Sequence, residues 1–73
     1  MLTSRELGSA KAKAIQLVRD KLRGYKFVTF NSRSRSRTSL EKEFAYRVGY
    51  EMVMMGLPVS DVAHHVHVSV KSL

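Results

Sequence analysis

The sequence contains no cysteine, no long apolar run and few acidic residues, and each shortage excludes something. Without cysteine, neither a disulfide nor a thiolate metal site can stabilise the fold. No segment approaches the roughly 18 apolar residues that span a bilayer. No apolar region follows the first six residues, as it would in a secretory signal. We therefore expect a cytoplasmic protein with no membrane partner.

The chain is also short, with 73 residues. A domain of this size buries only about 60% of the surface that its unfolded chain exposes. Its stability must come from a modest core or from a partner. We predict a single small basic domain that spans residues 1–73.

Acidic residues are scarce relative to basic ones. Six aspartates and glutamates stand against 13 lysines and arginines, which leaves a net charge of +7. So large a positive charge on so short a chain suggests a polyanionic partner. Nucleic acid is the first candidate, followed by an acidic protein surface. An anionic membrane comes last, because the apolar stripe of the basic first helix contains alanines and no aromatic anchor.

Signatures of catalysis are missing as well. The sequence has no glycine-rich phosphate loop and suggests no Ser–His–acid or paired-carboxylate arrangement. We expect neither enzymatic activity nor a cofactor. Of His64, His65 and His67, only His64 and His67 would share a helix face. No cysteine stands nearby and Asp61 is the only close carboxylate, so fewer than three metal ligands are assured and we expect no metal site. Surface histidines of this kind can contact phosphates when they are protonated.

A first helix is predicted to begin near the N-terminus. Thr3 and Glu6 have the spacing of a capping box, and Gly24 is a natural stop. Apolar residues recur at three- and four-residue steps, at Leu7, Ala10, Ala14, Val18 and Leu22. A helical wheel places the polar residues Arg5, Gln16, Arg19 and Arg23 on the opposite side. These arginines form either a binding surface or an ordinary solvated face.

A second helix is predicted to begin at a capping box formed by Thr38 and Glu41 and to end at Gly56. Its main apolar stripe consists of Leu40, Phe44, Val48, Met52 and Met55. A second stripe, Tyr46, Tyr50 and Val53, lies on another side. A helix that is apolar on two sides is either central in the fold or half at an interface.

The region between these helices divides into two parts. Residues 25–30 are aromatic and β-branched, which favours a short strand. Residues 31–39 form a flexible Arg/Ser loop, in which Arg33, Arg35 and Arg37 alternate with serine. In extended chain these arginines would project to one side about 7 Å apart, a spacing suited to successive phosphates. The alternative is a solvated loop that is kept soluble by its charge.

The C-terminal stretch, residues 56–73, has the pattern of a helix-turn-helix. Val62 and Ala63 supply the apolar and small residues that let a second helix pack closely against the first. Val66 is apolar before the turn, and His67 stands where a residue takes positive φ. After the turn, Ser69 can cap the second helix, and Leu73 points back to the core.

This stretch resembles the helix-turn-helix of bacterial response regulators and sigma-factor-like proteins. Gly56-Leu57 opens the unit, and the run from Val68 to Ser72 resembles the start of a recognition helix; Pro58 departs from the usual Ser or Thr cap. The resemblance covers 18 residues and implies DNA contact by Ser69, Val70 and Lys71. The sequence stops partway through the second helix, so only the first half of a reading surface is expected.

A strand is the competing interpretation of residues 66–71, because apolar and polar residues alternate there. Such a strand could pair with residues 25–30. We therefore predict a mainly α fold, a small three-helix domain with a helix-turn-helix-like C-terminus, with or without a short two-stranded sheet (25–30 with 66–71).

Three functional hypotheses follow. The first is a small transcription regulator that binds RNA polymerase, or another acidic protein surface, close to the phosphate backbone of DNA or RNA and modulates initiation or termination. In size and style the chain is similar to small phage-encoded regulators of host RNA polymerase. The second is a sequence-specific DNA-binding repressor or excision-type factor, with the loop arginines on phosphates. The third is a fragment or an antitoxin-like interaction module.

Overall fold

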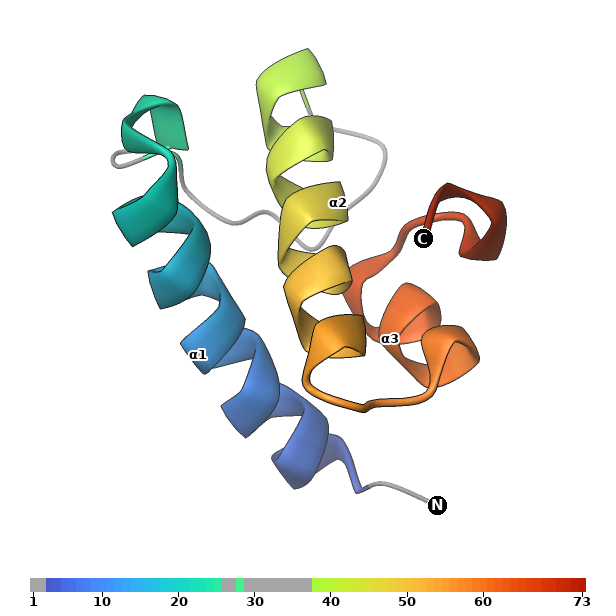
Figure 1. The fold of residues 1–73 in the computed structure, drawn as a ribbon. Coiled ribbons are helices and arrows are strands. Elements are labelled where there is room, and N and C mark those ends of the chain that lie inside the picture. Colours follow the sequence, from blue (N-terminus) through green and yellow to red (C-terminus); the bar gives the residue numbers. More distant parts are fainter. Residues whose placement is uncertain (1–2, 26–27, 29–37) are drawn as a thin grey trace.

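Three α-helices make up most of the molecule: α1 (Ser4–Lys21), α2 (Ser39–Met54) and α3 (Val59–Val66). The structure is a computed structural model and describes residues 3–25, 28 and 38–73. α1 and α2 run side by side in opposite directions, and α3 packs against α2 away from α1, so α2 is the central helix (Figure 1). The predicted mainly helical fold with three helices is confirmed.

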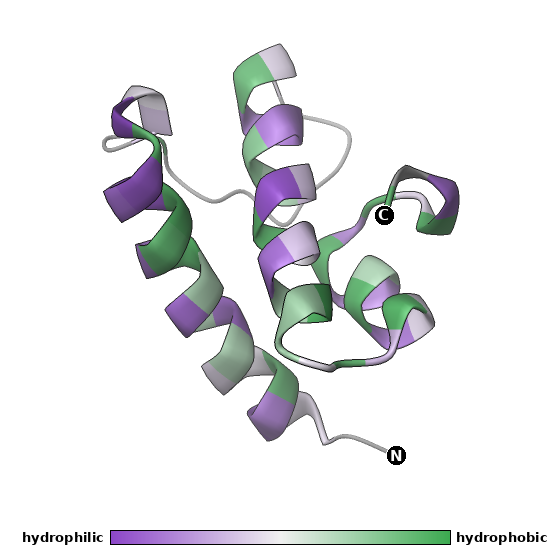
Figure 2. Ribbon diagram, in the orientation of Figure 1, coloured by the Kyte–Doolittle hydropathy of each residue, from purple (hydrophilic) through white to green (hydrophobic). Residues whose placement is uncertain are grey.

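α1 begins and packs as its sequence predicts, but it ends earlier. The Glu6 N–H donates to Thr3 Oγ1 at 3.2 Å, so Thr3 caps the helix. Bands of hydrophilic and hydrophobic residues alternate along α1, as expected for a helix with one buried side (Figure 2). The helix ends at Lys21 instead of Gly24, because Leu22 turns into extended conformation and residues 23–25 form a 3-10 turn, η1 (Arg23–Tyr25).

α2 begins at the predicted capping box. The Glu41 N–H donates to Thr38 Oγ1 at 3.2 Å, and the Thr38 N–H donates to Glu41 Oε1 at 3.3 Å. Thr38 and Ser39 are therefore the cap and first residue of α2, and the predicted loop 31–39 extends too far at its C-terminal end. Gly56, with φ of 93°, follows the helix end as predicted.

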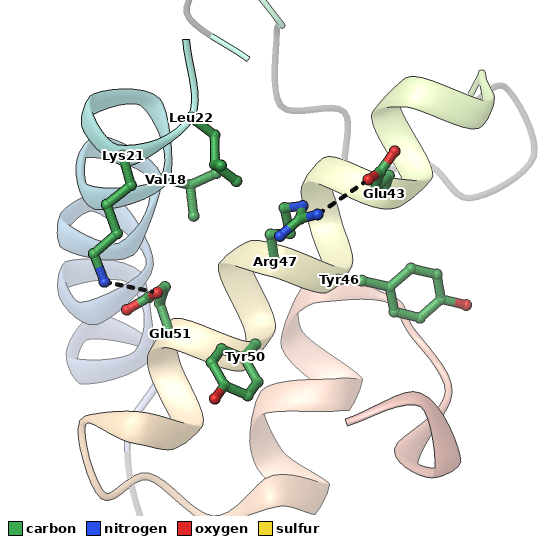
Figure 3. A pocket seen from close by; sticks show the side chains of 8 residues that line it. All are labelled: Val18, Lys21, Leu22, Glu43, Tyr46, Arg47, Tyr50 and Glu51. Carbon is green, nitrogen blue, oxygen red and sulfur yellow. Dashed lines mark hydrogen bonds and ion pairs between the residues drawn. The ribbon is translucent and has the colours of Figure 1, made fainter. Parts of the chain in front are cut away.

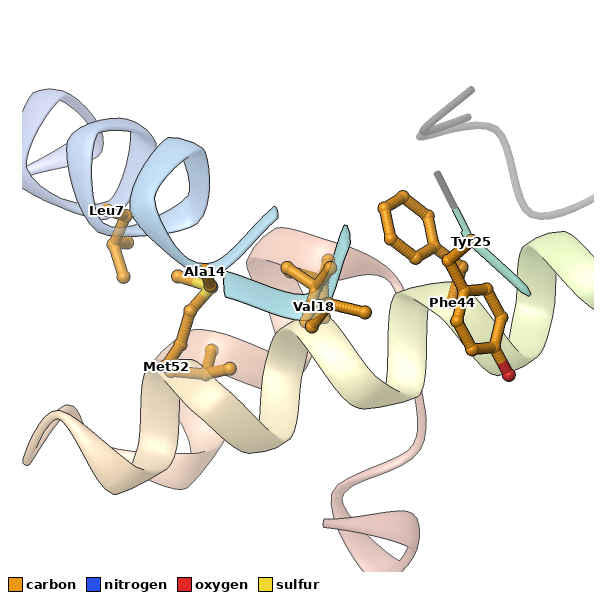
Figure 4. Packing of buried hydrophobic residues seen from close by; sticks show 9 residues of the cluster. Leu7, Ala14, Val18, Tyr25, Phe44 and Met52 are labelled. Atoms are coloured by element: carbon orange, nitrogen blue, oxygen red, sulfur yellow. The ribbon is translucent and has the colours of Figure 1, made fainter. Parts of the chain in front are cut away.

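The core lies where the three helices meet (Figure 4). Phe44, Val48 and Met52 of α2 are fully buried, in line with the predicted stripe. Leu40 and Met55, at the two ends of that stripe, are exposed instead. The remaining members of the buried cluster come from the other elements: Leu7, Ala14, Val18, Tyr25, Val62 and Val66.

The alternative strand over residues 66–71 is wrong. α3 continues to Val66, His67 adopts a left-handed conformation, and residues 70–72 form one turn of 3-10 helix, η3 (Val70–Ser72). The alternation of valines misleads because Val66 belongs to the buried helical row of Val62, whereas Val70 is exposed. Its proposed partner, residues 25–30, lies mostly outside the described residues, and Tyr25 belongs to η1.

None of the helices that the structure describes is long and apolar enough to cross a membrane.

Candidate nucleic-acid and partner interface

The turn after α3 has the geometry that the C-terminal pattern predicts. His67 has φ of 58° and ψ of 49°, and its N–H bonds the carbonyl of Ala63. The Val68 N–H donates to that same carbonyl at 3.0 Å, which is the bonding of a helix that ends in a left-handed residue. Val62, Ala63 and Val66 are buried, so α3 is held firmly against α2.

Leu73 packs the segment after the turn against α2. A Cβ added to Gly49 would lie 3.1 Å from Leu73 Cδ2 and 3.3 Å from Val66 Cγ2. The absence of a side chain at Gly49 therefore lets η3 approach the central helix closely.

The three predicted reading residues are brought together on this segment. Ser69, Val70 and Lys71 are all exposed, and the side chain of Val70 is 53% accessible. Ser69 precedes η3 in extended conformation, but its side chain makes no capping bond. This segment offers one turn of 3-10 helix instead of the α-helical start that the resemblance implies.

The predicted outward arginines of α1 do not act alike. Arg5 on α1 and Arg23 on η1 are exposed. Arg19 is half-buried instead: it donates from Nη2 to the carbonyl of Val28 at 2.8 Å, and its guanidinium carbon lies 5.7 Å from the centroid of the Phe44 ring. The prediction that Arg19 faces away from the core is wrong, because its guanidinium reaches the Val28 carbonyl and the ring of the buried Phe44.

Arg33, Arg35 and Arg37 lie outside the described residues. What the sequence does establish is the charge of the region in which they lie. Residues 26–37 hold four of the 13 basic residues and none of the six acidic ones. They therefore account for four of the seven net positive charges.

A cluster around Tyr25 was not predicted. The rings of Tyr25 and Phe44 stack with centroids 5.6 Å apart, and Arg47 Nε donates to the Tyr25 hydroxyl at 3.2 Å. Burial, followed by the hydrogen bond with Glu43, raises the pKa of Tyr25. The hydrogen bond from Tyr25 lowers the pKa of Glu43. No local sequence signal reveals this cluster, because Tyr25 lies 22 residues before Arg47 in the sequence.

Beside this cluster an open pocket of about 510 Å³ lies between α1 and α2 (Figure 3). Val18 and Leu22 supply its aliphatic wall, and Tyr46 and Tyr50 line it from α2. One ion pair joins the two helices at this pocket, with Lys21 Nζ 3.1 Å from Glu51 Oε1. A second lies along α2, with Arg47 Nη2 3.3 Å from Glu43 Oε1.

The three histidines occupy different environments. His64 and His67 are exposed, whereas His65 is half-buried, and its Nε2 is buried without a hydrogen-bond partner. Burial, followed by the charge of Lys11 and of the other two histidines, lowers the pKa of His65. Within residues 3–25, 28 and 38–73, no group of three or more side chains could hold a metal ion.

Comparison with protein-family models, curated proteins and solved structures finds no match for this chain.

Proposed function

We propose that this protein is a small basic transcription regulator that binds RNA polymerase, or another acidic protein surface, close to nucleic acid. The observation that best supports the proposal is the C-terminal unit of α3, the left-handed His67 and η3. This unit holds Ser69, Val70 and Lys71 together in solvent. A turn of this kind, followed by exposed polar and basic residues, suits contact with a nucleic-acid groove.

The charge of the chain supports a position next to nucleic acid. Each phosphate neutralised by a lysine or arginine releases counterions, and this term supplies most of the affinity of non-specific binding. Arg5 and Arg23 are exposed and can contribute to it. The arginines at positions 33, 35 and 37 add charge in a stretch without acidic residues.

The number of available base contacts favours a protein partner. A good bidentate contact discriminates by about 1–3 kcal/mol, whereas specific binding exceeds non-specific binding by about 4–10 kcal/mol. Of the three exposed residues after the turn, only Ser69 and Lys71 can form hydrogen bonds to base edges. Two such contacts reach at most the lower part of that range, so additional contacts with a protein would be needed.

Capture from a bacterial lysate, with and without nuclease, tests the proposal. We expect RNA polymerase subunits to be retained by the immobilised chain after nuclease treatment. A matched capture with Lys71→Ala should retain polymerase but lose part of the nuclease-sensitive nucleic acid. If no polymerase subunit is recovered under either condition, polymerase is not the partner.

A sequence-specific DNA-binding repressor or excision-type factor is the second candidate. The exposure of Ser69, Val70 and Lys71 on one turn favours it. Selection from a random duplex library would then return a preferred sequence. Lys71→Ala should relax that preference, while Lys42→Ala, which removes an exposed charge from α2, should preserve it. A library without enrichment would eliminate this candidate.

A further inference from the structure

One side of the α1–α2 pair leaves large apolar side chains uncovered. Six large hydrophobic residues are exposed in the described part of the chain, and four of them belong to this side. Tyr50 and Met54 on α2 are 54% and 67% accessible, Met55 follows at 40%, and Leu17 on α1 is 38% accessible. Exposed apolar residues that gather on one side of a small protein indicate an interaction surface.

Helical spacing arranges these residues into neighbouring rows. Leu17 and Lys21 lie four residues apart on α1, as do Tyr50 and Met54 on α2, so each pair shares a side of its helix. The pocket between the helices reaches Lys21 and Tyr50 (Figure 3). A second hollow, of about 560 Å³, joins Leu17 to Met55. We call this surface, which is formed by the two hollows and Met54, the α1–α2 face.

The charges of the α1–α2 face differ from those of the whole chain. Around the first hollow, the cations Lys21 and Arg47 are balanced by the carboxylates Glu43 and Glu51. Lys13, beside the second hollow, leaves the face with one net positive charge. The chain as a whole carries +7. Two copies would therefore repel one another on average, and this face is a place where they can approach with little repulsion.

We propose that the α1–α2 face binds a second copy of this chain in a two-fold symmetric dimer. In such an interface the same patch serves both partners, so the apolar residues of one copy would cover those of the other. Its cations could meet the carboxylates of the partner. Of the four groups in the two ion pairs within one chain, Lys21, Arg47 and Glu43 are exposed and Glu51 is half-buried. Ion pairs at the surface are worth only about 0–1 kcal/mol each, so exchanging the exposed pair Arg47–Glu43 between chains costs little.

A dimer interface requires only a limited part of the surface of this chain. A standard interface buries about 800 Å² on each side, roughly a sixth of the 5128 Å² surface of this chain. Nucleic acid is a poorer occupant, because Glu43 and Glu51 would repel phosphates. Self-association requires no nucleic acid or polymerase, so this inference stands or falls separately from the proposed function.

Sedimentation velocity of the pure chain tests the dimer over a concentration series in about 0.3 M salt, which screens repulsion between distant charges. We expect the mass to rise from 8.3 kDa toward twice that value with concentration. Met54→Lys should weaken dimerisation at least about tenfold, because it places a charge in the apolar patch. The matched control is Val70→Lys, which adds the same charge to an exposed residue of η3 and should leave dimerisation unchanged.

A pair of charge-reversal variants tests the dimer without requiring knowledge of which residues pair across the interface. Lys21→Glu leaves the first hollow with three carboxylates and one cation, and Glu51→Lys leaves it with the reverse. Each variant alone should dimerise less, and an equimolar mixture should restore the dimer, while circular dichroism checks that both variants fold. A chain that stays monomeric at every concentration overturns the inference. So does a dimer that responds equally to Met54→Lys and Val70→Lys, or a mixture that restores nothing.

Discussion

His67 adopts a left-handed backbone conformation that is unfavourable for a residue with a side chain. Among the residues that the structure describes, it is the only non-glycine with positive φ. A left-handed conformation costs an L side chain about 1–2 kcal/mol, and glycine adopts it without a clash. We expect His67→Gly to raise the free energy of unfolding by about 0.5–1 kcal/mol, since glycine's greater unfolded entropy offsets part of the gain.

The control for this prediction is a glycine placed three residues earlier. His64 is exposed inside α3, where glycine should lower the free energy of unfolding by about 1 kcal/mol. Urea denaturation of the two variants measures the difference. Equal shifts in both would mean that the backbone of His67 is not strained.

His65 should make the stability of the fold depend on pH. Burial and the nearby charges of Lys11, His64 and His67 lower its pKa from the ordinary value of 6.5. The unfolded chain then binds the proton more readily than the folded chain. The contribution of neutral His65 to the free energy of unfolding is therefore complete above about pH 6.5. It is lost as the pH falls through that value toward the lower pKa of His65 in the folded chain.

We expect the free energy of unfolding to fall between about pH 7.5 and pH 5.5. His65→Gln should flatten this dependence, because glutamine stays neutral. His64→Gln, which changes an exposed histidine of the same helix, should preserve most of it, because burial is the main cause of the lowered pKa of His65. Urea titrations across the pH series provide the measurement. A slope that is the same in both variants would assign the effect to other groups.

At the scale of elements, local sequence signals predict the helices well. Thr3 and Thr38 start α1 and α2 because a hydroxyl cap depends only on residues within one turn. The turn at His67 is likewise set by its neighbours. The end of α1 and the course of residues 66–71 were less predictable, because packing against α2 decides them. Alternating valines suit a strand and a helix end equally well until the burial of Val66 and the exposure of Val70 are known.

The close packing of η3 against α2 predicts an energetic coupling between Gly49 and Leu73. In Gly49→Ala the gain in helix propensity, about 1 kcal/mol, opposes a close contact with Leu73 and the fully buried Val66. We expect Gly49→Ala to be more favourable in a Leu73→Ala background than alone, by about 0.5–2 kcal/mol. A double-mutant cycle of urea denaturation curves measures this coupling. Additive effects would show that Leu73 does not limit the space at Gly49.

At the scale of the whole molecule, the candidate site was only partly predictable. Exposure of Ser69, Val70 and Lys71 followed from their place after the turn. The inward role of Arg19 did not, because its partners, Phe44 and the carbonyl of Val28, are brought to it by the tertiary fold. The α1–α2 face, with its single net positive charge, was equally hidden, since its ion pair between Lys21 and Glu51 joins residues 30 positions apart.

The uneven distribution of charge leads to a prediction for nucleic-acid binding. Nine basic and six acidic residues in the rest of the chain leave +3, and residues 26–37 add +4. The proposed function predicts that Arg33 and Arg35 each contact a phosphate. Replacing both by alanine should then reduce the slope of log affinity against log salt by about 2, because each lost contact removes about 0.9.

Fluorescence anisotropy with duplex DNA, between about 50 and 200 mM salt, measures that slope. The matched variant replaces Lys13 and Lys42 by alanine and removes the same two charges from the exposed surfaces of α1 and α2. It should change the slope by less than half as much. If the two double variants lower the slope equally, the binding responds to total charge alone, and the arginine-rich segment does not act as a phosphate clamp.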